Sequence, residues 1–345
     1  MNAMPAVCLQ STKPEDLQVI EAPIPVAGPG QVLLRPLRTG VCGSDLSAFL
    51  GKRNFDWVQR PRILGHEYSA VIETLGPGVE GFELGQLVTS VAMQSCLTCP
   101  NCRRGDTNLC RDRQIIGFHR DGAMAARCVC DTRYVMPILE GLTPVMASLI
   151  EPLSVASRCI ARHSGIRPGD SVLVTGPGII GMLCALLARS AGGRVSLVGV
   201  EGDRGVRLKK AEELGFDTLV VGPDALLEAQ LDEPADHLVE ASGAPPALAS
   251  AHKAVRYGGR LHVVATYGQD VTLDKTATVR SEQFVQTTMG SNWDDFMRAQ
   301  RHLLDGVIPV DSLVEEFALA DAVAAFEASR DRNTQKAVLV IPDSL

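Results

Sequence analysis

The chain has 345 residues, of which 46% are hydrophobic and 21% charged, the composition of a soluble globular protein with about two domains. It carries 40 acidic and 33 basic residues, and this acidic balance excludes nucleic acid and anionic membrane surfaces as expected partners. No apolar run reaches the ~18 residues that a membrane span requires. The first residues lack the basic region and apolar run of a secretory signal, so a cytoplasmic location is expected.

The chain before about residue 150 has the pattern of a β-rich domain. Short apolar stretches at 32–34, 70–74 and 87–89 are typical of strands. Turn signals rich in Gly and Pro, at 27–30 and 76–78, separate them.

Three features of this region and its end offer ligands for one reactive metal ion. Cys42 lies between glycines in Gly-Val-Cys-Gly-Ser-Asp, and His66 is followed directly by Glu67. Glu151 borders a largely apolar stretch. A thiolate, an imidazole and one or two carboxylates hold Zn²⁺ with one position open for water or substrate. Each also has a plain structural alternative: a buried thiol, a hydrogen-bonded histidine and a charge at a helix start.

Four further cysteines form a compact cluster, Cys96-x2-Cys99-x2-Cys102-x7-Cys110. Clustered cysteines in a reducing compartment hold metal more often than they form disulfides. A closed set of four thiolates is typical of structural zinc, and it leaves no open position for chemistry. An iron–sulfur centre and four free thiols are the competing interpretations.

From about residue 167 onward, strands and helices alternate, which indicates a parallel sheet covered on both faces. A buried helix is expected over 179–190, and another over 245–255 that Gly258 and Gly259 end. The remaining expected elements are strands at 171–175, 194–200, 218–221, 237–241 and 261–265, a helix at 203–214, and in the tail helices at 293–304 and 319–330 and a strand at 337–341.

The turn after the strand at 171–175 reads Gly176-Pro177-Gly178-Ile179-Ile180-Gly181. Between a strand and a helix, G-x-G-x-x-G is the fingerprint of a dinucleotide site. Gly176 permits the tight turn, Gly178 lets the backbone approach a pyrophosphate, and Gly181 lets helix and strand pack closely. Ile179 and Ile180 begin the helix, whose free N–H groups face the phosphates.

The residue that distinguishes NAD from NADP is less clear. An acid near the end of the second strand normally binds the 2′-hydroxyl of NAD, and Gly199 stands at the expected position. Glu201 is a candidate for the ribose hydroxyl, and Arg204 is a candidate for the 2′-phosphate of NADP. Both are also ordinary for a solvated loop.

With these motifs in this order, the chain resembles the zinc-dependent medium-chain alcohol/polyol dehydrogenase family, in particular its sorbitol (L-iditol) and threonine dehydrogenase branch. The resemblance covers nearly the whole chain. It rests on residues 40–45, Pro-Arg-Ile-Leu-Gly-His-Glu at 61–67, the four cysteines, Ile-Glu-Pro-Leu at 150–153 and the glycine turn.

The resemblance implies that Cys42, His66 and Glu67 are ligands of a catalytic zinc. It implies that Glu151 ligates this zinc or stands behind its water. Ser44, beside Cys42, is a candidate for relaying the alcohol proton, with a turn-capping hydroxyl as the alternative. The implied cofactors are one catalytic and one structural zinc per chain and NAD or NADP.

The family fold is α/β: a GroES-like β-rich catalytic domain with an inserted Rossmann domain, a doubly wound parallel sheet. In this chain it places the catalytic domain at 1–153 and 290–345, with a zinc lobe at about 94–112. The Rossmann domain then spans 154–289. A homodimer or homotetramer is also implied.

The expected function is oxidation of a secondary alcohol on a small polar substrate, such as a polyol or sugar acid. Threonine-type amino-alcohol oxidation is the first rival, which Ser47 disfavours because threonine-type relatives have a relay histidine at that position. Two further rivals are a zinc-free reductase of the superfamily and a non-catalytic nucleotide-sensing protein. The metal-ligand set argues against both.

Overall fold

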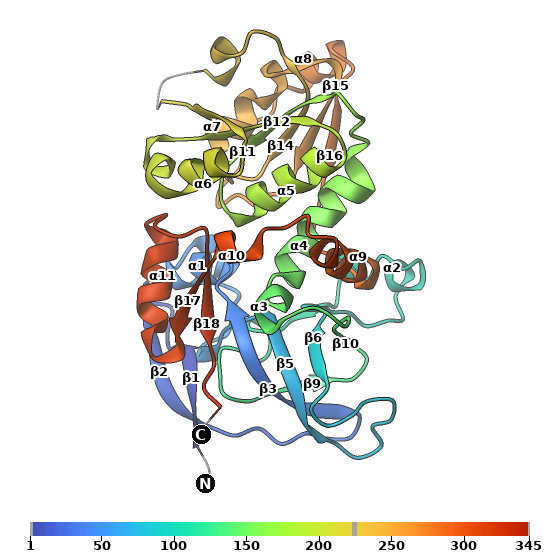
Figure 1. The fold of residues 1–345 in the computed structure, drawn as a ribbon, viewed down its shortest axis with the longest axis vertical. Coiled ribbons are helices and arrows are strands. Elements are labelled where there is room, and N and C mark those ends of the chain that lie inside the picture. The colour runs from blue at the N-terminus through green and yellow to red at the C-terminus, as the bar shows by residue number, and fades with distance from the viewer. Residues whose placement is uncertain (1–2, 223–225, 344–345) are drawn as a thin grey trace.

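A computed structural model describes residues 3–222 and 226–343 of the chain. An upper region built on a parallel sheet is stacked on a lower, β-rich region (Figure 1). Residues 1 and 2 belong to the segment that is expected to lack a secretory signal, and they lie outside the described residues. Among the described residues, no helix has both the length and the apolar character that crossing a membrane requires.

The upper region is a six-stranded sheet of order β13-β12-β11-β14-β15-β16, in which every pair is parallel. The order runs outward in both directions from β11 and β14, so a crevice for a ligand is expected at their carboxyl ends. Its strands are β11 (Ser171–Thr175), β12 (Arg194–Gly199), β13 (Asp217–Val220), β14 (Ala235–Glu240), β15 (Val255–Val263) and β16 (Phe284–Thr287).

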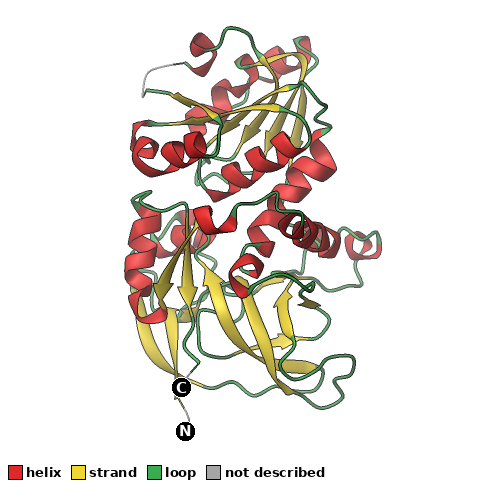
Figure 2. Ribbon diagram, in the orientation of Figure 1, coloured by secondary structure: helices red, strands yellow, loops and turns green. Residues whose placement is uncertain are grey.

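Helices cover both faces of this sheet (Figure 2). Helix α5 (Ile179–Ser190) is buried at every residue from Gly181 to Ala188, as its apolar sequence predicts. The remaining helical segments here are η4 (Glu201–Asp203), η5 (Arg204–Leu208), α6 (Lys209–Glu213), η6 (Leu227–Gln230), α7 (Pro245–Ser250), η7 (Ala251–Lys253) and α8 (Lys275–Arg280).

One expected helix stop is wrong. Gly258 and Gly259 lie inside β15 rather than after a helix. The pairing of β14 with β15 shifts register here, and Gly258 has a φ of 70°. A side chain on Gly259 would also lie 2.9 Å from the Asp236 carbonyl oxygen. The two glycines therefore form a bulge in a strand, which is another common use of glycine in a sheet.

The lower region contains a seven-stranded sheet of order β10-β6-β5-β3-β18-β17, with β9 also paired to β3, and a three-stranded sheet of order β2-β1-β4. Its strands are β1 (Ala3–Leu9), β2 (Leu17–Pro23), β3 (Gln31–Gly40), β4 (Arg62–Ile63), β5 (Glu67–Leu75), β6 (Leu87–Ser90), β7 (Met93–Gln94), β8 (Gln114–Ile115), β9 (Cys128–Asp131), β10 (Val135–Pro137), β17 (Val314–Ala318) and β18 (Lys336–Val340). Its helical segments are α1 (Gly43–Phe49), η1 (Arg53–Phe55), α2 (Pro100–Arg103), η2 (Thr107–Leu109), α3 (Pro144–Ala147), α9 (Trp293–Leu304), α10 (Val310–Leu313), η8 (Leu319–Asp321) and α11 (Ala322–Arg330).

The lower region contains the first and the last strands of the described residues, β1 and β18. Strand β18 pairs antiparallel with the end of β3, so that Val338 lies opposite Gly40. The chain leaves this region through α4 (Ile150–Ser157) and η3 (Arg158–Ser164) and returns through α9. A buried ion pair of 2.7 Å between Arg158 and Asp295 joins the exit to the return. The expected α/β fold with a doubly wound domain inserted into a β-rich one is confirmed.

Candidate active site

Two of the three motifs predicted for a reactive metal meet closely in the lower region. Cys42, His66 and Glu67 each offer one ligand atom, and these atoms lie within 4.8 Å of one another. His66 is 5% exposed and Glu67 1%, so bulk water does not compete for them. A thiol, an imidazole and a carboxylate at this spacing are a zinc-type donor set with room for a fourth ligand.

Cys42 is fixed by the start of a helix. It is the N-cap of α1, and its amide donates to the Asp45 carboxylate at 3.1 Å. Ser44 donates its hydroxyl to the Cys42 sulfur at 3.0 Å, and the same oxygen lies 3.4 Å from His66 Nε2. The Ser44 hydroxyl therefore contacts both of these ligand atoms.

His66 follows a turn that only glycine permits. Gly65 has a φ of 102°, and a side chain there would lie 2.8 Å from the backbone nitrogen of Met124. The turn sends His66 Nδ1 toward Asp45, at 3.5 Å from a carboxylate oxygen that is fully buried. The two atoms do not form a hydrogen bond, but a carboxylate on the Nδ1 side of the ring favours Nε2 as the ligand atom. Asp45 belongs to the motif at 40–45, but nothing in the motif itself indicates that this carboxylate orients a histidine.

Lys336 is a site residue that sequence reasoning missed. It is 1% exposed, and its ammonium donates to Glu67 Oε2 and to the Val41 carbonyl oxygen, the latter at 2.8 Å. Gly40 leaves the space for this pair, because a side chain there would lie 2.5 Å from Glu67 Oε2. Lys336 lies at the start of β18, which the chain brings here only on its return.

Glu151 lies on the first turn of α4 and is buried, but it is not in the group of atoms within 4.8 Å. Burial raises the pKa of Glu151 to about 7, and the Glu67 carboxylate adds to the rise while His66 opposes it. Burial also raises the pKa of the Cys42 thiol and of Asp45. The site thus gathers one thiol and three carboxyl groups around one ammonium and one imidazole. A divalent cation would neutralise the negative charge of this arrangement. The donor set therefore fits zinc.

The second cysteine set also meets. Cys96, Cys99, Cys102 and Cys110 offer sulfur atoms within 4.8 Å of one another. The Cys99–Cys102 and Cys96–Cys102 separations are 3.5 and 3.9 Å. Four thiolates at ~2.3 Å from zinc form a tetrahedron with edges of about 3.8 Å. Hydrogen bonds from Thr98 and from the Cys99 amide lower the pKa of Cys96 to about 6, which favours the thiolate.

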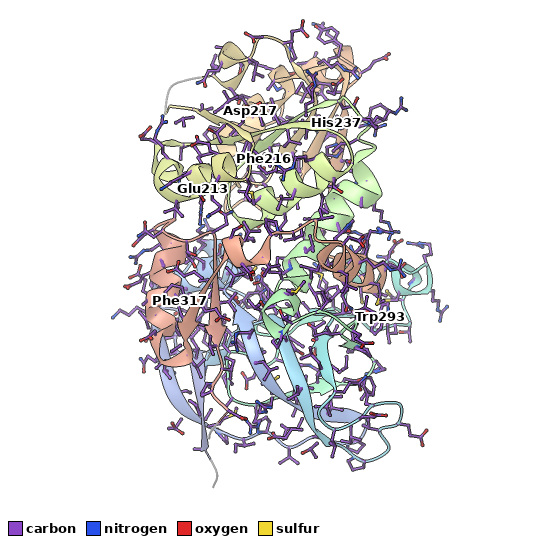
Figure 3. The ribbon with its side chains drawn as sticks, in the orientation of Figure 1. Glu213, Phe216, Asp217, His237, Trp293 and Phe317 are labelled. Carbon is purple, nitrogen blue, oxygen red and sulfur yellow. The ribbon has the colours of Figure 1, made fainter. Side chains whose placement is uncertain are left out.

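This zinc lobe, residues 94–112, is tied to the returning chain. Asn108 donates its side-chain amide to the Met289 carbonyl oxygen at 2.7 Å, and Asn292 donates to that of Gly105 at 3.0 Å. Trp293 begins α9 beside the lobe (Figure 3). The lobe therefore supports the point where the chain re-enters the lower region.

We expect Cys99→Ser to lower the zinc content from two ions to one per chain and to reduce the melting temperature by several degrees, because the lobe loses a ligand that holds its loops. Metal analysis and calorimetry measure the two effects. Cys8→Ala, which alters a buried thiol of β1, is the control and should keep both ions. Unchanged zinc content in Cys99→Ser would contradict a four-cysteine site.

The glycine turn joins β11 to α5 as its sequence predicts. Gly176 has a φ of 89°, and a side chain on it would meet the Ser242 backbone at 2.5 Å. A side chain on Gly181 would lie 2.0 Å from the Gly176 carbonyl oxygen. At Gly178 the nearest atom to an added side chain is an Arg207 nitrogen at 4.0 Å, so this face is open. An open backbone face at a helix N-terminus suits a pyrophosphate.

The returning chain connects this turn to the metal site. Gln335 donates its side-chain amide to the Pro177 carbonyl oxygen at 2.9 Å, and the next residue is Lys336. Two adjacent residues thus contact the glycine turn and Glu67. The candidate ribose residues Glu201 and Arg204 begin the short helical segments η4 and η5 after β12, where they pair with each other at 3.2 Å.

The remaining histidines near these regions, and Ser47, have ordinary hydrogen-bond partners. His119 Nδ1 accepts from the Ile115 amide at 3.1 Å, and its ring lies 4.7 Å from that of Trp57. His237 on β14 (Figure 3) and His262 on β15 are buried neighbours, with His237 Nδ1 3.2 Å from His262 Nε2. Among the described residues, neither belongs to a set of ligand groups that could hold a metal. Ser47 donates to the Gly43 carbonyl oxygen at 2.9 Å.

Comparison with known proteins identifies the family. Residues 28–140 match the alcohol dehydrogenase GroES-like domain, and residues 180–305 match the zinc-binding dehydrogenase domain. The chain therefore belongs to the zinc-dependent medium-chain dehydrogenases. It is an oxidoreductase acting on CH–OH groups, with zinc and NAD(P) as cofactors.

Several named relatives and solved structures are similar to this chain over nearly its whole length. Sorbitol dehydrogenase of Halalkalibacterium halodurans is 33% identical, over 93% of this chain and 94% of its own length. L-threonine 3-dehydrogenase of Pyrococcus horikoshii is 30% identical (97% and 98%), and L-galactonate-5-dehydrogenase of Escherichia coli K12 is 28% identical (91% and 90%). A solved zinc-binding dehydrogenase of Sinorhizobium meliloti 1021, bound to NADP, has a TM-score of 0.85 at 26% identity, over 99% of this chain and 100% of that one.

Proposed function

We propose that this protein oxidises a secondary alcohol of a small polyol or sugar acid, using NAD(P)⁺ beside a zinc ion. The observation that carries the proposal is the meeting of the half-buried Cys42 with the buried His66 and Glu67. The similarity to sorbitol and L-galactonate dehydrogenases supports the substrate class. When bound, zinc polarises the alcohol and the nicotinamide accepts the hydride.

Each side chain of the site has a distinct proposed role. Cys42 Sγ, His66 Nε2 and one oxygen of Glu67 are the proposed metal ligands. Lys336 holds the other Glu67 oxygen, and Asp45 orients His66 from behind. Glu151 is proposed to stand behind the metal-bound water, because it is buried but is not among the groups whose ligand atoms lie within 4.8 Å of one another. Ser44 is proposed to carry the alcohol proton away, since its hydroxyl contacts two of the ligand atoms.

Aromatic rings extend from the site and support an elongated substrate. The Phe118 ring lies 5.3 Å from that of His66 and 5.8 Å from that of Trp57. Trp57 is 46% exposed, so its ring is available to a ligand. The C–H faces of a polyol can pack on such a ring, so Trp57 is proposed as a contact for the part of the substrate distant from the reacting carbon.

The test is a panel of polyols, sugar acids and L-threonine with NAD⁺ and with NADP⁺, followed by nicotinamide absorbance. We expect a polyol or sugar acid to give the highest kcat/KM. L-threonine as the best substrate would favour the amino-alcohol alternative, which the Pyrococcus relative supports. No turnover of any alcohol by the zinc-loaded protein would contradict the proposal.

We propose a homodimer or homotetramer as the assembled state. Strand β16 is the last strand of its sheet among the described residues, and all four of its residues are exposed, including Phe284 and Val285. An exposed apolar edge strand is a template for pairing with a second copy. Light scattering should give two or four chains per particle, and a monomer at micromolar concentration would contradict the proposal.

The catalytic domain is proposed to comprise residues 1–153 and 290–345, with the Rossmann domain at 154–289 between them. A cytoplasmic location is proposed because all ten cysteines are unpaired thiols, a state that a reducing compartment maintains.

A further inference from the structure

The end of β12 has no side chain where many dinucleotide-binding proteins carry an acid. Gly199 is its last residue. A side chain there would lie 3.1 Å from atoms of Asp203, Leu208 and Pro177, so the fold leaves little room for one. In this class of sheet, the second strand ends beside the adenine ribose, and an acid there accepts hydrogen bonds from the hydroxyls of NAD.

The nearest buried acid does not replace it. Asp203 is 5% exposed, and its Oδ2 accepts from the Val200 amide at 3.1 Å. The same oxygen lies 3.3 Å from Arg332 Nη1, and Oδ1 lies 3.7 Å from Arg207 Nη1. Both oxygens are occupied by groups of the protein. Asp203 therefore positions two guanidinium groups and is not free to accept from a ribose.

Three arginines, Arg204, Arg207 and Arg332, lie around η4 and η5, the helical segments that follow β12. Arg207 reaches Gly178 of the glycine turn, and its position is fixed because it also donates to the Ser329 and Thr334 carbonyl oxygens. Arg332 comes from the segment between α11 and β18 and lies 3.4 Å from where a side chain on Gly202 would be. Arg332 has a φ of 62°, a left-handed conformation in which glycine is usual.

The charge of this cluster is not balanced. Three guanidinium groups, of Arg204, Arg207 and Arg332, face the carboxylates of Glu201 and Asp203. The Arg204–Glu201 pair is exposed, with side chains 61% and 78% accessible, and such pairs are weak enough to exchange for a better partner. The Arg332 side chain is 42% exposed and that of Arg207 only 18%, so Arg204 and Arg332 are the guanidinium groups available to an incoming anion.

We propose that Arg204 and Arg332 bind the 2′-phosphate of the adenine ribose, so that this protein uses NADP(H) in preference to NAD(H). The inference rests on the proposed function, which requires a nicotinamide dinucleotide at the glycine turn. A dianionic phosphate forms charge-assisted hydrogen bonds to arginine forks, whereas the one exposed acid near Gly199, Glu201, already pairs with Arg204.

The test measures binding of NADPH and NADH directly, by calorimetry on the zinc-loaded protein, with 2′,5′-ADP and 5′-ADP as probes without a reactive ring. We expect NADPH to bind at least tenfold more tightly than NADH, and 2′,5′-ADP more tightly than 5′-ADP. Arg204→Gln and Arg332→Gln should each weaken NADPH about tenfold and change NADH less than threefold, and Arg332→Lys should restore part of the loss. Arg194→Gln, at the opposite end of β12, is the matched control and should change neither affinity.

The outcomes separate this inference from the proposed function. Equal or tighter binding of NADH, or equal losses for both cofactors in Arg204→Gln, would overturn the NADP assignment and leave the dehydrogenase function intact. Failure of both NADPH and NADH to bind would overturn the assignment together with the function. Arg204 is exposed and distant from the core, so its replacement tests the assignment without disturbing folding.

Discussion

Replacing His66 by alanine is expected to lower kcat/KM for alcohol oxidation by about a thousandfold or more, because the metal site loses one of three protein ligands. Metal analysis should show one zinc ion per chain in place of two, since the four-cysteine set is untouched. The fold should be retained, which a circular dichroism spectrum like that of the parent protein would show.

His302→Ala is the control, since His302 lies on α9 and belongs to neither cysteine-containing ligand group. It should keep both zinc ions and nearly full activity. Turnover of His66→Ala at the level of the parent protein would falsify the metal-site assignment.

Replacing Lys336 by methionine is expected to destabilise the protein by about 3 kcal/mol, because Glu67 keeps a buried charge without its partner. Lys336 and Glu67 are each 1% exposed, so water cannot compensate for the loss. Zinc affinity should also fall by about tenfold or more, since a carboxylate ligand without its outer hydrogen bond is poorly oriented. Denaturant unfolding and competition with a chelator measure the two quantities.

Lys253→Met is the matched control. Lys253 pairs with Glu228 at 3.4 Å, but its side chain is 50% exposed, and such a pair contributes about 1 kcal/mol or less. We expect its unfolding free energy and zinc affinity to stay near those of the parent protein. Equal effects of the two substitutions would contradict the role given to Lys336.

Local motifs made much of the site predictable. The cysteine spacing from 96 to 110 identifies one metal set, because the whole set lies on one short loop segment. The glycine turn at 176–181 is likewise local in the sequence. Gly176 and Gly181 are needed there because a side chain at either position would collide with neighbouring atoms. The strand–helix alternation after it predicts the parallel sheet, because buried strands and helices differ in apolar period and length.

Contacts between distant segments were not predictable in the same way. Lys336 and Glu67 are 269 positions apart, and nothing in the sequence around either residue indicates that the two are in contact. Arg332, between α11 and β18, reaches the segment after β12 only because the chain has returned to the lower region through α9. The wrong helix stop at Gly258 and Gly259 has a related cause: glycine marks a bulge as readily as a helix end, and only the pairing with β14 decides between them.

Anomalous diffraction from crystals of the protein at the zinc absorption edge would locate both metal ions without reference to activity. We expect two peaks per chain, one among the four cysteine sulfur atoms and one between Cys42 Sγ, His66 Nε2 and the Glu67 carboxylate. A crystal grown with zinc that shows density only at the cysteine lobe would contradict a reactive metal at Cys42, His66 and Glu67.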